Sequence, residues 1–219
     1  MRTATFARKT KETDINLTVN LDGSGKTELA TGVGFFDHML DAFSRFAQID
    51  LALTCQGDLY VDEHHTIEDV GICLGKAIRD ALGDRAGIRR VGSAWMPMDE
   101  ALAFAAIDIS GRPYLAFTAE FATLHCGDMG TQMAEEFFRA LTVNAGLTVH
   151  VNVAAGRNDH HKLEALFKAF GLALRDAMRV DSGIQGVLST KGALDSASQF
   201  LIHHLKMTGG NSHDPLPCH

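Results

Sequence analysis

Hydrophobic and polar residues alternate in short stretches along this chain, a pattern typical of half-buried β-strands. Clear examples are residues 49–54 and residues 147–153. Each stretch follows a segment whose apolar residues recur every three or four positions, residues 35–43 in one case and residues 133–141 in the other. That spacing is typical of an amphipathic helix. The pattern therefore predicts a helix followed by a strand, twice along the chain.

The helix-and-strand pair in each half of the chain is part of one internal repeat. The motif His-His-x-x-Glu at residues 64–68 returns 96 residues later at residues 160–164. The match continues without a gap to Arg-Asp-Ala at residues 79–81 and 175–177, and it gives eight identities in eighteen positions. We therefore expect two similar halves, and a helix over this segment in each of them.

The repeating unit predicts the fold class. Each half is expected to run strand, strand, helix, strand, strand, helix. The opening strands lie near residues 14–21 and 26–29, or near residues 102–109 and 115–121. The prediction is an α+β protein with two similar fused half-domains, each a mainly antiparallel four-stranded sheet with helices on one face.

The repeat also sets the expected domain limits. The first half-domain is assigned to residues 1–88 and the second to residues 89–192. Residues 193–219 have no partner in the repeat, and they end in a polar, glycine- and proline-containing sequence. We expect this tail to be disordered or vector-derived.

Composition narrows the class of protein. A content of 46% hydrophobic and 21% charged residues is ordinary for a globular protein and argues against disorder. No apolar run approaches the roughly 18 residues of a membrane span, and the first twenty residues lack a secretory signal, so we expect a cytoplasmic protein. With 27 acidic and 20 basic residues the net charge is -7, which argues against nucleic acid or a membrane surface as a partner.

The paired histidines are the strongest chemical signal. On a helix, Glu68 lies four residues after His64 and three after His65, so these side chains can converge on one face. Adjacent histidines point about 100° apart, so two metal ions, each taking one histidine of a pair, fit better than one ion. His38 and its repeat counterpart Glu136 complete the candidate ligand set of His38, His64, His65, Glu68, Glu136, His160, His161 and Glu164.

These candidate ligands are imidazole and carboxylate groups without a thiolate. That mixture suits Mn²⁺, Zn²⁺ or Fe²⁺, and the share of carboxylates favours Mn²⁺, with two ions per site. The alternative is a pair of solvated helices whose histidines bind nothing. A single His-His-x-x-Glu motif would favour that alternative, but two copies related by a repeat favour metal binding.

An ordered series of motifs resembles the imidazoleglycerol-phosphate dehydratase family of histidine biosynthesis over about residues 5–194. The motifs include Thr10-Lys11-Glu12-Thr13, Phe36-Asp37-His38-Met39-Leu40, Asp62-Glu63-His64-His65, Ser110-Gly111-Arg112-Pro113, Ala155-Gly156-Arg157-Asn158 and Ser189-Thr190-Lys191-Gly192. The resemblance implies a di-manganese hydro-lyase that converts D-erythro-imidazoleglycerol phosphate to imidazoleacetol phosphate. It also implies a large homo-oligomer, typically of 24 subunits, with active sites between subunits.

Residue roles follow from the same resemblance. All eight candidate ligands match metal-binding positions of the family, although Glu136 stands where some relatives have histidine. Glu12 matches the acid/base and substrate-binding position. The phosphate of the substrate is assigned to Arg90, Arg112, Lys168, Ser189 and Lys191. Lys168 has separate support, because it lies one helical turn beyond Glu164 and its repeat counterpart is the apolar Ile72.

The implied substrate explains why a metal is wanted. Its hydroxyl is on the carbon next to an imidazole ring, and the hydrogen to be removed from the next carbon is not acidic. A metal-bound imidazolate could expel the hydroxyl through a diazafulvene-like intermediate, which makes that hydrogen acidic. Two alternatives stay open: a dinuclear phosphohydrolase, and a non-catalytic protein in which metal ions only join subunits.

Overall fold

The structure is a computed structural model, and it describes residues 1–191 and 194. Apart from Leu194, the tail predicted at residues 193–219 therefore lies outside the described residues. The first half of the chain contains β1 (Thr3–Lys9), β2 (Thr13–Asn20), β3 (Thr27–Ala30), α1 (Gly34–Ala47), β4 (Asp50–Gly57) and α2 (His64–Leu82). The second contains β5 (Val91–Met98), β6 (Ala101–Asp108), β7 (Tyr114–Thr118), β8 (His125–Cys126), β9 (Met129–Gly130), α3 (Met133–Ala145), β10 (Thr148–Ala155) and α4 (Asp159–Met178).

The two halves have the same sheet topology. The first sheet has the order β1-β2-β4-β3 and the second the order β5-β6-β10-β7. In the first sheet β4 pairs in parallel with β3, and in the second sheet β10 pairs in parallel with β7, whereas the other pairings are antiparallel. The predicted fold class, two similar halves with mainly antiparallel four-stranded sheets, is confirmed.

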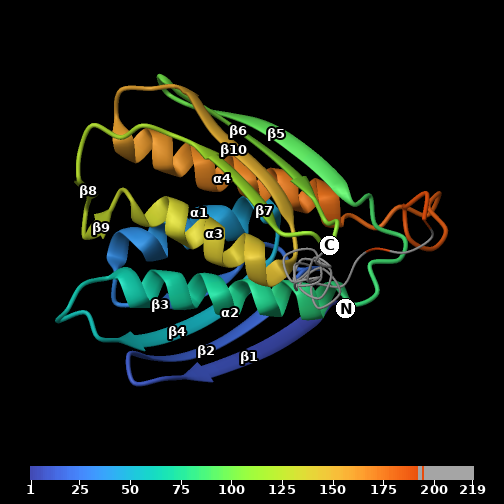
Figure 1. Cartoon of the computed structure of the whole chain (residues 1–219), viewed down its shortest axis with the longest axis horizontal. Helices are drawn as coiled ribbons and strands as arrows, with labels where there is room; N and C mark the ends of the chain where they lie inside the picture. The colour runs from blue at the N-terminus through green and yellow to red at the C-terminus, as the bar shows by residue number, and fades with distance from the viewer. Residues whose placement is uncertain (192–193, 195–219) are drawn as a thin grey trace, which may run out of the picture.

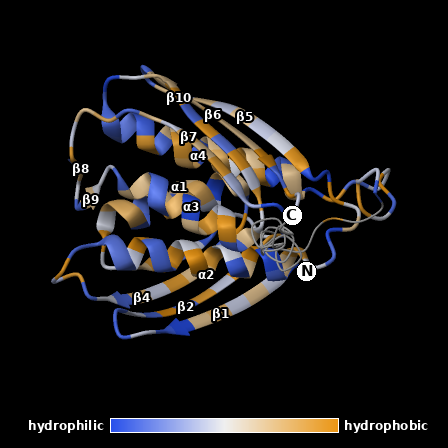
Figure 2. Cartoon of the chain, in the orientation of Figure 1, coloured by the Kyte–Doolittle hydropathy of each residue, from blue (hydrophilic) through white to orange (hydrophobic). Residues whose placement is uncertain are grey.

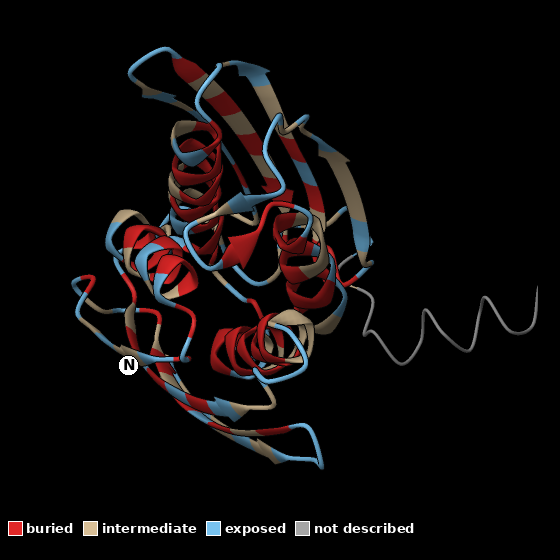
Figure 3. Cartoon of the chain, turned by 90° about the vertical axis from the view of Figure 1, so that its left-hand side faces the viewer, coloured by how far each residue is buried: buried red, intermediate tan, exposed pale blue. Residues whose placement is uncertain are grey.

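The four helices lie between the two sheets (Figures 1 and 3). Helices α1 and α2 contact the first sheet, and α3 and α4 contact the second. Across the middle of the molecule, α2 packs against α3 and α1 packs against α4. Both halves thus share one helical interior, because the apolar face of each helix pair is covered by the other pair.

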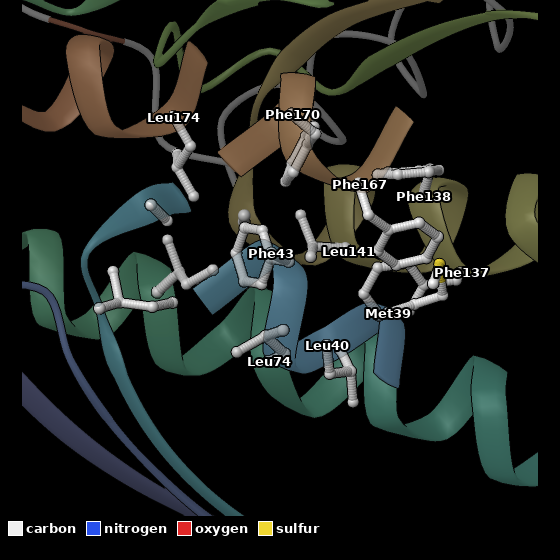
Figure 4. Close-up of a cluster of buried hydrophobic side chains, with 14 of the residues drawn as sticks. Met39, Leu40, Phe43, Leu74, Phe137, Phe138, Leu141, Phe167, Phe170 and Leu174 are labelled. Carbon is white, nitrogen blue, oxygen red and sulfur yellow. The ribbon is translucent and has the colours of Figure 1, made fainter. Parts of the chain in front are cut away.

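The hydrophobic core lies where the four helices meet. Figure 4 shows side chains from all four: Met39, Leu40 and Phe43 from α1, Leu74 from α2, Phe137, Phe138 and Leu141 from α3, and Phe167, Phe170 and Leu174 from α4. All ten are almost completely buried. The apolar spacing that predicted the helices is therefore the spacing that forms this core.

The predicted order of strands within each half is wrong. In each half, three strands of the four-stranded sheet, not two, precede the first helix, and only one strand separates the two helices. In the second half the short strands β8 and β9 also precede that helix. The strands that pattern analysis missed are β1 and β5, which lie at the edges of their sheets. The inward-facing residues of β1, Ala4, Phe6 and Arg8, are only partly buried, so its sequence lacks strong alternation.

The described helices include none with the length and continuous apolar character that crossing a membrane requires.

Candidate metal centre and active site

The paired histidines stand at the first turns of α2 and α4, at the same end of the molecule (Figure 1). Figure 2 shows these turns as hydrophilic. Asn158 caps α4, because its side chain accepts hydrogen bonds from the backbone N–H groups of His160 and His161 at 2.9 and 3.3 Å. Asp62 accepts from the N–H of His64 in the same way at 2.9 Å. These bonds fix the start of each helix and so the position of its histidines.

Three predicted ligands form a compact group between α1 and α4. The Oε2 atom of Glu164 lies 3.2 Å from His160 Nε2 and 3.5 Å from His38 Nε2. One donor atom from each residue lies within 4.8 Å of the other two. Within residues 1–191 and 194, this is the one group of three or more potential ligands with such spacing. Its donor set, two imidazoles and a carboxylate, suits a divalent transition-metal ion.

Lys168 keeps the carboxylate of this group charged. Its Nζ lies 2.5 Å from Glu164 Oε1, one helical turn along α4. Burial alone would raise the pKa of Glu164, but the hydrogen bond and charge of Lys168, together with His38 and His160, outweigh it, and the pKa falls below its ordinary value. Glu164 is therefore ionised at neutral pH, as a metal ligand must be.

The first copy of the motif, at residues 64–68, is less complete in this chain. His64 Nε2 lies 3.8 Å from Glu68 Oε2 on α2. Glu136, on α3, instead pairs with Arg139 of its own helix at 3.6 Å. The structure therefore brings together His64 and Glu68, but it does not show a three-residue group at this copy.

His65 and His161 point away from their neighbours in each pair. The rings of His64 and His65 are 6.1 Å apart and cross at 82°, and the same values hold for His160 and His161. The divergence expected for adjacent histidines is confirmed, whereas the expected convergence of His65 on Glu68 is not seen.

These two histidines contact carboxylates that sequence analysis missed. His65 Nδ1 lies 3.1 Å from Asp58 Oδ2, and His161 Nδ1 lies 2.8 Å from Glu100 Oε2. The hydrogen bond to its carboxylate raises the pKa of each histidine above the ordinary value. Hydrogen bonds from His161 and from the backbone of residues 157 and 158 lower the pKa of Glu100 to about 2. The sequence offered one signal for Glu100: it directly precedes β6, just as Glu12 directly precedes β2 in the first half.

Glu12, the predicted acid/base, lies next to this set. Its Oε1 atom is 3.9 Å from His65 Nε2, and its side chain is 53% exposed. The position just before β2 holds it at the end of the first sheet beside the first turn of α2. Its carboxylate can therefore reach a molecule bound near His65.

Four of the five predicted phosphate ligands line one pocket of about 620 Å³. They are Arg90, Arg112, Ser189 and Lys191, and Ser110 lines the same pocket. The guanidinium of Arg90 donates to both carboxylate oxygens of Asp108 at 2.6 and 2.9 Å and to the carbonyl of Leu188 at 2.8 Å. The fifth predicted residue, Lys168, lies apart from this pocket, beside Glu164.

The pocket and the metal-ligand group lie at opposite ends of α4. Arg90 donates its N–H to the carbonyl of Ala177, 17 residues after His160. At 1.5 Å per residue this separation along the helix is about 25 Å. Figure 1 shows the segment after α4 at the end away from the N-terminal turns of α2 and α4. Within one chain, the predicted phosphate pocket and the predicted metal ligands are therefore far apart.

Comparison with known proteins gives one consistent family. Residues 31–174 match the family model described as imidazoleglycerol-phosphate dehydratase. A protein of that name from Acetivibrio thermocellus is 57% identical over 188 residues, which cover 86% of this chain and 96% of the relative. Another from Ruminiclostridium cellulolyticum is 55% identical over 194 residues, covering 89% of this chain and all of the relative.

Solved structures agree with the sequence comparison. The imidazoleglycerol-phosphate dehydratase of Staphylococcus aureus is 38% identical, with a TM-score of 0.75, and the match covers 82% of this chain and 99% of that one. The structure from Pyrococcus furiosus, described as a complex with (S)-C348, is 37% identical, also with a TM-score of 0.75. It covers 86% of this chain and all of that one.

Proposed function

This chain belongs to the imidazoleglycerol-phosphate dehydratase family, hydro-lyases of histidine biosynthesis, and we propose that it dehydrates imidazoleglycerol phosphate to imidazoleacetol phosphate in a metal-dependent reaction. The observation that carries metal dependence is the group of His38, His160 and Glu164, whose donor atoms lie within 4.8 Å of one another. Neither the phosphohydrolase nor the purely structural alternative accounts for membership of a dehydratase family.

The residues of this group fit a bound metal ion. Two imidazole nitrogens and one ionised carboxylate oxygen are a donor set for Mn²⁺, our first choice, or for Zn²⁺ or Fe²⁺. His64, His65, Glu68, Glu136 and His161 would supply the remaining ligands of two ions. Bound metal would favour loss of a proton from the imidazole ring of the substrate, which makes the ring a better electron donor. The diazafulvene-like route stays a prediction.

Glu12 would move the proton that is hardest to remove. Its exposed carboxylate lies close to His65, so it can reach the carbon with the non-acidic hydrogen in a substrate bound near His65. Once the hydroxyl has left, that hydrogen is acidic enough for a carboxylate to accept it at Oε1. The resulting enol then becomes the ketone of the product.

Cationic and hydroxyl groups would hold the phosphate. Arg90, Arg112, Ser189 and Lys191 share a pocket, where guanidinium groups can donate paired hydrogen bonds to phosphate oxygens. Lys168 would reach the phosphate from beside Glu164, in a site shared between chains.

The separation of the two parts supports self-association. Since about 25 Å of α4 separates the pocket from the metal-ligand group within one chain, a substrate that contacts both needs a second chain. The solvent-facing side of the second sheet offers a contact surface: Trp95 is 58% exposed and lies 4.8 Å from the ring of Phe104 on the neighbouring strand. The corresponding side of the first sheet carries polar pairs such as Thr5 and Thr18. We propose a homo-oligomer, of 24 subunits as the resemblance implies.

Turnover of authentic substrate tests the proposal. Purified protein is incubated with Mn²⁺ and imidazoleglycerol phosphate, and both the ketone and free phosphate are measured. The proposal expects ketone without phosphate release. Release of phosphate without ketone would instead support the phosphohydrolase, and neither product would support a structural role for the metal.

The substitution Glu12→Gln tests the acid/base assignment. It keeps the shape of the side chain but removes its ability to accept a proton, so dehydration should fall by several orders of magnitude. Metal content and particle size should not change. Turnover close to that of the unmodified protein would refute the assigned role.

A further inference from the structure

His65 and His161 each present the same ring nitrogen to a carboxylate. The bonds run from His65 Nδ1 to Asp58 and from His161 Nδ1 to Glu100. An ionised carboxylate only accepts hydrogen bonds, so Nδ1 carries the hydrogen in both rings. The lone pair of each neutral ring is then on Nε2, the nitrogen that remains for a metal ion.

The two carboxylates come from non-equivalent positions of the repeat. Asp58 directly follows β4, but the corresponding segment at the end of β10, residues 154–156, reads Ala-Ala-Gly and has no carboxylate. Glu100 directly precedes β6, and the residue that directly precedes β2 is Glu12. The second half therefore orients its histidine with the counterpart of Glu12.

Glu12 and Glu100 have different surroundings despite this equivalence. Glu100 Oε1 accepts the backbone N–H groups of Arg157 and Asn158 at 3.0 and 2.7 Å, and its Oε2 receives His161. Both of its oxygens are thus occupied. Glu12 Oε1 is 3.9 Å from the nearest nitrogen of His65, beyond hydrogen-bond distance. The Asp58 side chain, only 11% exposed, holds His65 in its place.

We infer that Asp58 and Glu100 are positioning residues that perform the same task in the two halves. Each fixes its histidine with Nε2 available to metal, and Asp58 does so in the first half in place of Glu12, which is left available for proton transfer. This inference rests on the proposed function, because it concerns how the chain presents ligands to the metal. The two repeat-related glutamates then have different roles: Glu12 exchanges a proton with the substrate, and Glu100 orients His161.

The matched variants Glu12→Gln and Glu100→Gln test the inference directly. Mn²⁺ is titrated into metal-free protein, and binding is followed by calorimetry and by the electron paramagnetic resonance signal of free Mn²⁺. For Glu100→Gln we expect affinity at one ion to fall by roughly 10- to 100-fold, the usual effect of losing a carboxylate behind a metal-bound histidine. Asp58→Asn should have an effect of the same size. Glu12→Gln should bind Mn²⁺ within about twofold of the unmodified protein.

A double-substitution experiment separates positioning from a general effect on the loop, since Glu100 also accepts two backbone hydrogen bonds. If Glu100 acts through His161, then Glu100→Gln should cost no further Mn²⁺ affinity in a His161→Ala background. A loss that persists in that background, or full affinity in Glu100→Gln and Asp58→Asn alike, overturns the inference. If Glu100→Gln does not fold, Asp58→Asn with His65→Ala gives the same test.

Failure of the proposed function gives a different result. Unmodified protein that binds no Mn²⁺, Zn²⁺ or Fe²⁺ would remove the metal site and with it the inference. Unmodified protein that binds metal and is active, together with unchanged affinity in the variants, would remove only the positioning roles of Asp58 and Glu100.

Discussion

Replacement of Gly75 by alanine should destabilise the protein, although alanine is the better helix former. Gly75 on α2 lies where this helix crosses α3. A Cβ atom there would be 2.6 Å from the carbonyl oxygen of Leu141 and 3.0 Å from the backbone nitrogen of Ala145. Backbone atoms cannot rotate away as a flexible side chain can, so the two helices must separate.

Two opposing effects set the magnitude. To reach an ordinary contact of 3.4 Å, the Cβ of residue 75 must move 0.8 Å from the oxygen (3.4 − 2.6). Insertion of a methyl group into a tightly packed core costs about 1–3 kcal/mol, and a shift against backbone is at the upper end. The higher helix propensity of alanine stabilises the helix by about 1 kcal/mol relative to glycine. We expect a net loss of about 2 kcal/mol in the free energy of unfolding.

The repeat supplies a second test of the same reasoning. Gly171, the counterpart of Gly75, lies where α4 crosses α1, and a Cβ there would be 2.7 Å from the carbonyl oxygen of Phe43. Gly171→Ala should cost a similar amount. At Gly34, the first residue of α1, the nearest atom would be 3.5 Å away, so Gly34→Ala should be neutral or slightly stabilising.

Urea unfolding of metal-free protein, at one fixed protein concentration, measures these differences. The fixed concentration matters because association stabilises a folded chain by mass action. If Gly75→Ala and Gly171→Ala are as stable as the unmodified protein, the helices have room to accept a side chain. The close crossing would then not explain why glycine stands at both positions.

Two further outcomes follow from individual contacts. Asp128 accepts the backbone N–H groups of Gly34 and Phe35 at the start of α1 at 2.7 and 2.8 Å, and burial, which raises its pKa, is outweighed by these bonds, so the pKa is lowered. Asp128→Ala should cost about 1 kcal/mol at neutral pH. A carboxylate whose pKa is lowered in the folded state stabilises the protein above its unfolded pKa and loses this effect as the pH falls through its folded pKa. The difference in stability between the unmodified protein and Asp128→Ala should therefore shrink below about pH 4. Urea unfolding at a series of pH values would measure it. Separately, a chelator should convert the proposed assembly to smaller species if, as proposed, metal ligands are shared between chains. An unchanged particle in light scattering would contradict shared ligands.

Most of the fold was accessible from the sequence because the helices form the shared interior. The spacing of residues such as Phe43 and Phe138 is dictated by burial on one helix face. Strands β1 and β5 gave no such signal. The inward face of β1 is only partly buried, and in β5 outward-facing positions such as Val91 and Trp95 are also apolar, so neither strand alternates clearly. The repeat could still have located them, since each directly precedes a strand that was predicted.

The candidate site was accessible only where its residues are close in the sequence. His160 and Glu164 meet because they are four residues apart on one helix. The contacts of His65 with Asp58 and of His161 with Glu100 depend on how the loops at the strand ends turn. Spacing does not encode such turns. Lys168 shows the same limit: the spacing gave its contact with Glu164, but not its distance from the other residues predicted to bind phosphate.

The pocket proposed for the phosphate marks a difference between the duplicated halves. Residues 183–191, after α4, supply much of its lining. The chain after α2 has only residues 83–90 before β5 begins, so the first half has no equivalent segment. Conversely, the first half keeps an available glutamate at position 12, whereas its counterpart Glu100 is occupied by His161. Among the described residues, the second half thus builds the pocket proposed for the phosphate and the first half supplies the glutamate proposed for proton transfer, so the two halves contribute different parts of the proposed site.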